Sequence, residues 1–251
     1  MKGLGIVAAV VLLPVLLAVA LFAFSGDRGV ALLPEAERKA ALATQSDDYV
    51  AGNPDSSVVL VEYLDYQCPA CAAYHPVVNQ LVEEYGDRVA FVTRHFPLAF
   101  HANARPAAYA VEAAGRQDRR AEFSDLIFEN QAVWSARPFS EDTFDSYAQE
   151  LGLDMDRFIV DRSDQVIVDK VQSQYETGLA VGVNSTPSFF LDGERLDNPA
   201  NIEEARAILD RTLAESGQDN SPSTDEESVS EVKASSTESD LDSASTTEET
   251  N

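Results

Sequence analysis

The hydrophobic pattern early in the chain predicts two buried strands joined by a helix. Residues 58–61 are an unbroken run of Val and Leu, which is typical of a strand buried on both faces, and the strand continues through residues 62–63. Apolar side chains then recur every three or four positions from 74 to 85, which predicts a helix that stops at Gly86. Residues 89–95 form the next apolar run. This order predicts a parallel pair of strands with a helical crossover.

The middle of the chain, residues 102–178, changes to helical spacing throughout. A block of this length is too long for a connection within a compact sheet. We therefore expect a helical subdomain inserted into an α/β scaffold, with Trp134 in its core. The segments with the clearest helical spacing are residues 104–114, 123–127, 144–151, 155–160 and 166–175.

The scaffold resumes after this block with a hairpin and a final helix. Residues 188–191 predict a strand, and the Asp-Gly pair at 192–193 is a strong hairpin signal that lets residues 194–196 return as its partner. Asn201 is placed to cap the last helix, with a Glu three residues later. The predicted domain spans residues 48–215.

The first 25 residues predict a membrane anchor or a signal sequence. Residues 4–24 are apolar, Gly or Pro throughout, and at about 1.5 Å per residue they span roughly 31 Å, the thickness of a hydrocarbon core. A cleaved signal peptide is the alternative, although its apolar stretch is usually about 7 to 15 residues. Lys2 precedes the run, which places the N-terminus of a single-pass cell-membrane protein in the cytoplasm and the domain outside. Residues 26–47 are expected as a juxtamembrane linker with a short helix at 35–43.

Charge excludes one class of partner and predicts a disordered C-terminus. The chain of 251 residues has 18 Lys and Arg against 43 Asp and Glu, a formal net charge of −25. Nucleic-acid binding needs clustered cations and is not expected. Residues 216–251 hold ten acids, one Lys and no aromatic residue, too little apolar area to offset the entropy of ordering. We expect this acidic tail to be disordered and, without an obvious dimerisation segment, the chain to be a monomer.

The chain's two cysteines, Cys68 and Cys71, stand between the first buried strand and the helix that follows it. A purely structural disulfide between them would add little stability, because closing so short a loop removes little entropy from the unfolded chain. Zinc is a poor interpretation, since a closed site needs about four ligands and only His75, His95 and His101 could supplement the thiolates. Of these, His75 is expected to be a solvated helix residue and the other two to have structural or surface roles. Amide N–H groups at a helix start favour a thiolate on the first cysteine, so the pair predicts thiol–disulfide exchange.

A resemblance to a known family extends this site across most of the chain. The motif Cys68-Pro69-Ala70-Cys71 follows a buried strand that carries Glu62, and Thr186-Pro187 directly precedes the strand at 188–191. With the inserted helices, these features resemble the DsbA-like disulfide oxidoreductases of the thioredoxin superfamily. The resemblance covers residues 48–215 and implies a thioredoxin-like α/β fold with an inserted helical subdomain.

The resemblance also implies a role for each residue of the site. Cys68 would be the attacking cysteine and Cys71 the resolving one. Pro187 would be cis and lie beside the pair, where substrate backbone docks, and Thr186 would offer a hydroxyl or backbone group to the sulfurs. Glu62 would be a buried acid whose pKa is raised by desolvation, so that it relays a proton to or from the resolving cysteine.

Some of these assignments have alternatives. Pro69 and Ala70 would face the substrate, but Ala70 lacks the ionisable side chain that some strongly oxidising members carry there, which leaves the oxidising strength open. Glu62 has the alternative of a solvated acid on an edge strand. Pro187 has the alternative of a trans proline in an ordinary loop, since only about 5% of such bonds are cis.

Together these features predict an extracytoplasmic, membrane-anchored thiol:disulfide oxidoreductase that forms disulfide bonds in exported proteins. Its substrates would be reduced exported proteins, and it needs no cofactor or metal. By family analogy, a separate quinone-linked membrane oxidase would re-oxidise the cysteine pair. Two alternatives stay open: a disulfide reductase or isomerase with the same residues, and a non-catalytic module that binds unfolded clients.

Overall fold

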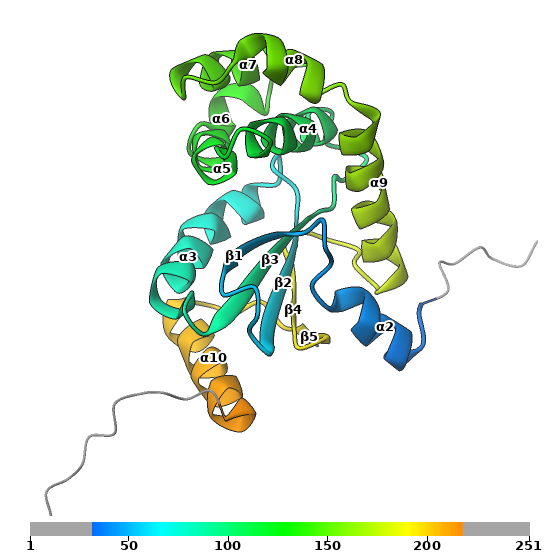
Figure 1. Cartoon of the computed structure of the whole chain (residues 1–251), viewed down its shortest axis with the longest axis vertical. Helices are drawn as coiled ribbons and strands as arrows, with labels where there is room; N and C mark the ends of the chain where they lie inside the picture. The colour runs from blue at the N-terminus through cyan, green and yellow to red at the C-terminus, as the bar shows by residue number, and fades with distance from the viewer. Residues whose placement is uncertain (1–31, 218–251) are drawn as a thin grey trace, which may run out of the picture. The chain divides into compact units, whose positions relative to one another are not determined.

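The computed structural model describes residues 32–217, which build a five-stranded mixed sheet with helices on both faces (Figure 1). The strands are β1 (Tyr49–Gly52), β2 (Val58–Leu64), β3 (Val89–His95), β4 (Ser188–Leu191) and β5 (Glu194–Leu196). Their order across the sheet is β1-β3-β2-β4-β5. β2 and β3 run parallel, whereas the other neighbouring pairs are antiparallel. The thioredoxin-like α/β arrangement is thus confirmed, including the parallel pair.

The central position of β2 explains its unbroken hydrophobic run. It pairs with β3 along its whole length, from Val58 opposite Val89 to Leu64 opposite His95, and with β4 on its other side. Helices cover both faces, so every residue of β2 except Val59 is buried. A polar side chain in this strand therefore has no route to solvent except through a cavity.

Two helices pack against each face of the sheet (Figure 1). One face is covered by α3 (Pro69–Tyr85) and α10 (Ile202–Ser216), and the other by α2 (Glu35–Leu42) and α9 (Gln165–Ala180). Buried side chains of the first face include Leu60, Leu81 and Leu209, and those of the second include Leu42, Val61 and Phe190. The helix predicted over 74–85 is confirmed, with its end before Gly86.

The inserted helices gather beyond one end of the sheet and form a core of their own (Figure 1). Aromatic side chains fill this core, among them Trp134, whose indole N–H donates to the carbonyl of Ile127 over 2.8 Å. The same cluster of buried residues includes Cys68 and Cys71. The helices are α4 (Ala104–Gly115), α5 (Arg120–Glu129), α6 (Gln131–Trp134), α7 (Glu141–Glu150) and α8 (Met155–Asp161). The helical insert and the core position of Trp134 are confirmed. The helix predicted at 166–175 as part of the insert is α9, which also packs against a face of the sheet.

The predicted hairpin and final helix are also confirmed. Asp192 and Gly193 join β4 to β5 with φ values of 49° and 82°, the left-handed conformation that a two-residue hairpin turn requires. Asn201 caps α10 by accepting a hydrogen bond from the N–H of Glu204 over 2.9 Å. This helix ends at Gly217, whose φ of 73° is again left-handed.

The segment before β2 differs from its predicted role as a spacer. β1, a half-buried edge strand, did not appear in the hydrophobic pattern, and α2 packs onto the sheet through Leu42, which is 1% exposed. The guanidinium of Arg94 in β3 holds this region, because it donates to the carbonyls of Ala41 and Ala43 and pairs with Asp48 over 2.7 Å. Residues from Glu35 onward therefore contribute to the domain core rather than to a linker.

Two predicted segments lie outside the described residues: the apolar run at 4–24 and the acidic tail beyond residue 217. Among residues 32–217, no helix has both the length and the apolar character needed to cross a membrane.

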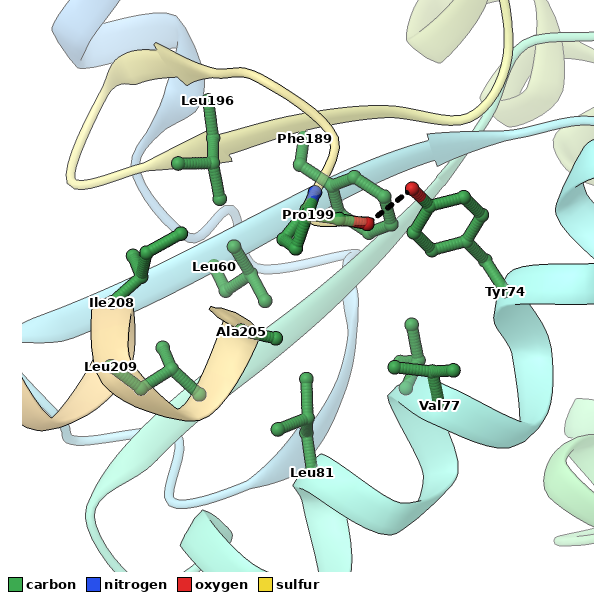
Figure 2. Close-up of a pocket in the computed structure, with 11 residues that line it drawn as sticks. Leu60, Tyr74, Val77, Leu81, Phe189, Leu196, Pro199, Ala205, Ile208 and Leu209 are labelled. Carbon is green, nitrogen blue, oxygen red and sulfur yellow. Dashed lines mark hydrogen bonds between the residues drawn. The ribbon is translucent and has the colours of Figure 1, made fainter. Parts of the chain in front are cut away.

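A small apolar cavity lies between α3, α10 and the sheet (Figure 2). Its volume is about 30 Å³, and its walls include Leu60, Val77 and Phe189. The hydroxyl of Tyr74 points across its rim and donates to the carbonyl of Pro199 over 2.7 Å. Since these two polar groups satisfy each other, the cavity is a gap in apolar packing rather than a site for a polar ligand.

Candidate active site

The Cys-Pro-Ala-Cys sequence stands where β2 passes into α3. β2 ends at Leu64, and residues 65–67 form the turn that enters the helix. Cys68 is the N-cap residue with extended backbone, and Pro69 takes the first helical position, where a missing N–H has no consequence. Cys71 follows in the first turn. The free N–H groups of this turn therefore surround the first cysteine.

The two cysteines lie beside the loop that precedes β4. Both are free thiols, 7% exposed at Cys68 and 1% exposed at Cys71. The Sγ atom of Cys68 is 3.3 Å from the carbonyl oxygen of Thr186, to which Cys68 donates when its thiol is protonated. The peptide bond between Thr186 and Pro187 is cis. The structure thus brings residues from opposite ends of the domain to one sulfur.

The two thiols have opposite pKa shifts. The pKa of Cys68 is lowered from 9.0 to about 5, chiefly by a hydrogen bond from the Cys71 thiol, against the opposing effect of burial. The Thr186 side chain and the N–H groups of Cys71 and Ala70 lower it further. The pKa of Cys71 is raised, first by burial, then by its hydrogen bond to Cys68 and by the negative charge that Glu62 carries once it is ionised. At neutral pH, Cys68 is therefore a thiolate and Cys71 a thiol.

Glu62 lies in the middle of β2, opposite Thr93 of β3 and Phe189 of β4. Its side chain is 6% exposed, and burial raises its pKa from 4.5 to about 8. It faces a cavity of about 280 Å³ that extends to His75 and Asp125. A cavity of this size with polar walls has room for water. The edge-strand alternative is therefore wrong: Glu62 is a buried acid that keeps its proton at neutral pH.

A buried carboxylate that the sequence analysis missed lies in the turn before Cys68. The side chain of Asp65 is completely buried, and its Oδ2 atom is 2.7 Å from Nδ1 of His101. The backbone N–H of Asp65 donates to Sγ of Cys71 over 3.5 Å, and its carbonyl accepts from the N–H of Cys68 over 3.0 Å. Asp65 therefore touches both cysteines through its backbone and a histidine through its side chain.

Two glutamines that were not predicted as site residues connect this turn to the helical insert through hydrogen bonds. The side chain of Gln131 in α6 donates to the carbonyls of Tyr66 and Cys68 over 2.8 and 3.0 Å. Gln67 reaches back and donates to the carbonyl of Ser135 over 2.7 Å. The insert thus fixes the backbone on which the first sulfur sits.

The other two histidines are hydrogen-bonded to carboxyl groups of Asp125 and Glu112. His75 is 2.6 Å from Asp125, and its side chain is 17% exposed, so the expectation of a solvated residue is wrong. His95 is fully buried and 2.7 Å from Glu112, which also pairs with Arg120, so its structural role is confirmed. Within the part of the chain that the structure describes, no group of three or more His, Cys, Asp or Glu side chains is arranged to hold a metal ion.

Comparison with known families agrees with this fold and motif. The family model described as Thioredoxin matches residues 44–211, about two thirds of the chain. The chain belongs to the thioredoxin family. Its thioredoxin domain begins ahead of β1 and ends within α10, so the match includes the helical insert and both cysteines.

Solved structures of a thioredoxin-like oxidoreductase and of a DsbA protein share the fold of this thioredoxin domain. A thioredoxin-like oxidoreductase from Silicibacter pomeroyi DSS-3 superposes with a TM-score of 0.60 and 25% identity, covering 69% of this chain and 96% of that one. Wolbachia pipientis alpha-DsbA1 superposes with a TM-score of 0.65 and 20% identity, covering 71% of this chain and 96% of that one. The DsbA-like resemblance seen in the sequence is therefore confirmed.

Curated relatives of the thioredoxin-family chain carry a different name. A sodium–proton antiporter NhaA of Herminiimonas arsenicoxydans is 32% identical over 163 residues, which are 65% of this chain and 25% of that protein. An NhaA 3 antiporter of Salinispora tropica is 35% identical over 163 residues, 24% of its length. The chain thus spans about a quarter of these relatives.

Proposed function

We propose that this protein is an extracytoplasmic thiol:disulfide oxidoreductase that forms disulfide bonds in exported proteins. The observation that carries the proposal is the asymmetry of the cysteine pair. Cys68 has a pKa of about 5, is 7% exposed and lies against Thr186, whereas Cys71 is 1% exposed and has a raised pKa. Exchange chemistry needs one sulfur that leaves readily as a thiolate and a second that waits within reach.

The reaction begins with the Cys68–Cys71 disulfide and ends with both thiols. A substrate thiolate attacks Sγ of Cys68, a mixed disulfide forms, and the electron pair of the broken bond goes to Sγ of Cys71, which takes up a proton. The second thiol of the substrate then loses its proton to solvent and attacks the substrate sulfur. Cys68 leaves as a thiolate, the substrate is oxidised by two electrons, and the cysteine pair is reduced.

Glu62 supplies the proton for Cys71 in this scheme. With a pKa of about 8, it holds a proton at neutral pH, and the charge that its loss creates raises the pKa of Cys71. The cavity of about 280 Å³ gives Glu62 a path for exchange with solvent past His75 and Asp125. This is general acid–base catalysis by a carboxyl tuned through burial.

The low pKa of Cys68 favours the oxidising direction over the reductase or isomerase alternative. A thiolate stabilised in the reduced protein makes the disulfide a stronger oxidant, and a pKa of about 5 lies between the values of about 3.5 for DsbA and about 7 for thioredoxin. Ala70 contributes a backbone N–H to this stabilisation but no charged side chain. We therefore place the protein among moderately strong oxidants.

The location and partners that we propose are based on the sequence. The apolar run at 4–24 anchors a single-pass protein with its N-terminus in the cytoplasm, so the thioredoxin domain lies outside. Reduced exported proteins are its substrates, and a quinone-linked membrane oxidase restores the Cys68–Cys71 disulfide. The antiporter names of the curated relatives, which denote membrane proteins, support a place at a membrane.

A redox titration against glutathione, paired with refolding of reduced ribonuclease, tests the proposal. We expect a reduction potential well above the value of about −270 mV that characterises thioredoxin, and oxidation of ribonuclease that Cys68→Ser abolishes. A potential near −270 mV would contradict the oxidising direction and favour a reductase. Equal activity of wild type and Cys68→Ser would contradict enzymatic exchange and favour a client-binding module.

A further inference from the structure

We propose that the buried pair of Asp65 and His101 is a positioning unit for disulfide exchange. The pair fixes the turn whose Asp65 N–H stabilises the thiolate that forms on Cys71 when the disulfide opens. This inference rests on the proposed function and names residues that act in its first chemical step.

A backbone N–H group faces the buried sulfur of Cys71. The backbone N–H of Asp65 lies 3.5 Å from Sγ of Cys71, and this contact lowers the pKa of Cys71 against the larger effects that raise it. A thiolate that forms in a site 1% exposed to solvent cannot draw on bulk water for stabilisation. A donor already aimed at the sulfur supplies that stabilisation without rearrangement, as in an oxyanion hole.

The side chain of the same residue determines where this N–H points. One carboxylate oxygen of Asp65 accepts from the N–H of Gln67 over 2.7 Å, which closes the turn. The other accepts from the N–H of Leu98 over 2.9 Å and from Nδ1 of His101 over 2.7 Å. The turn at the sulfurs is thus tied to the segment that follows β3.

His101 is the member of this set that a substitution can remove selectively. Its ring is 16% exposed at the domain surface and, within the described residues, its hydrogen bond is to Asp65 alone, so its loss leaves no other group unpaired. Without it, the completely buried carboxylate keeps two backbone donors and loses its side-chain donor. We expect the turn to loosen at the residue that touches Cys71.

The test compares His101→Phe, which keeps a ring but has no donor, with His101→Asn, whose amide can replace Nδ1. Both are made in the full-length chain. The first readout is the rate at which glutathione opens the Cys68–Cys71 disulfide at pH 7. We expect His101→Phe to be slower by roughly 5- to 10-fold, the effect of one modest hydrogen bond, and His101→Asn to lie within about twofold of wild type.

The second readout separates positioning from general loosening. Alkylation of Cys68 by iodoacetamide in the reduced chain does not form a thiolate on Cys71, so its rate is expected within about twofold of wild type in both variants. The inference is overturned if His101→Phe opens its disulfide at the wild-type rate, if His101→Asn is equally slow, or if alkylation slows in parallel. His101→Leu, which also lacks a donor, replaces His101→Phe if the latter fails to fold.

The wild-type measurement keeps the two proposals apart. If glutathione fails to open the wild-type disulfide, the exchange function itself is refuted. If wild type exchanges and Cys68→Ser does not, while His101→Phe behaves as wild type, the function stands and the positioning role of His101 is refuted.

Discussion

The stability of Glu62→Gln relative to wild type should increase as the pH rises. Burial raises the pKa of Glu62 from 4.5 to about 8. Between these two values the native state holds a proton that the unfolded chain has already released, so the wild type loses stability with rising pH. Gln has nearly the same shape and does not titrate, and it removes this loss.

The size of the effect follows from the pKa difference. Each pH unit between about 4.5 and 8 lowers the free energy of unfolding of the wild type by about 1.4 kcal/mol. The difference between Glu62→Gln and wild type should therefore grow by roughly 3 kcal/mol from pH 4.5 to pH 7 and reach roughly 5 kcal/mol above pH 8. Below pH 4.5 both states of the wild type are protonated, so the difference becomes constant.

Guanidinium unfolding of the reduced proteins at pH values from 4 to 9 measures this difference. The slope against pH is the decisive quantity, because the new amide adds an offset that does not depend on pH. Glu62→Leu provides a second variant without a titrating group, and it should show the same slope with another offset. A difference curve that stays flat between pH 5 and 8 would refute the raised pKa and, with it, the role of Glu62 as a proton donor.

Two further predictions concern the thiol pair and the buried charges of the insert. Cys71→Ala removes the largest cause of the low pKa of Cys68, so the midpoint of Cys68 alkylation against pH, expected near 5 in wild type, should move upward; an unchanged midpoint would contradict the assigned hydrogen bond. Glu112→Gln leaves the buried Arg120 and the nearby Lys170 without their carboxylate and should lower the free energy of unfolding by about 3 to 5 kcal/mol. Chemical denaturation measures this loss, and a change below about 1 kcal/mol would contradict it.

Most of the scaffold could be predicted from the sequence because its signals are local. The unbroken apolar run of β2, the three- and four-residue spacing of α3 and the Asp-Gly turn at 192–193 each predict one element from its own residues. β1 was not predicted, because an edge strand of four residues with half-buried side chains produces no clear hydrophobic pattern. The packing of α2 on the sheet was not predicted for another reason. It depends on hydrogen bonds from Arg94, which lies about fifty positions further along the chain.

The candidate site was predictable only in part. The cysteine pair stands out by its spacing, whereas Glu62 and the Thr186-Pro187 pair were identified through the family resemblance. Asp65 was missed because nothing in its neighbourhood of the sequence reveals its partner, His101, which lies 36 positions away in the loop after β3. Such pairings become visible only when the sheet brings the two loops together.

The helical insert and the cysteine pair share one buried core, which limits how far the insert can be replaced. Cys68 and Cys71 belong to the same buried cluster as Trp134 and the other aromatic side chains of the insert, and Gln131 holds the backbone at the first sulfur. The insert therefore contributes to the structure around the two cysteines and cannot be exchanged without affecting them. Replacing the insert of this chain by that of a relative would change the surroundings of Cys68 and Cys71, and with them the redox behaviour, even with every active-site residue retained.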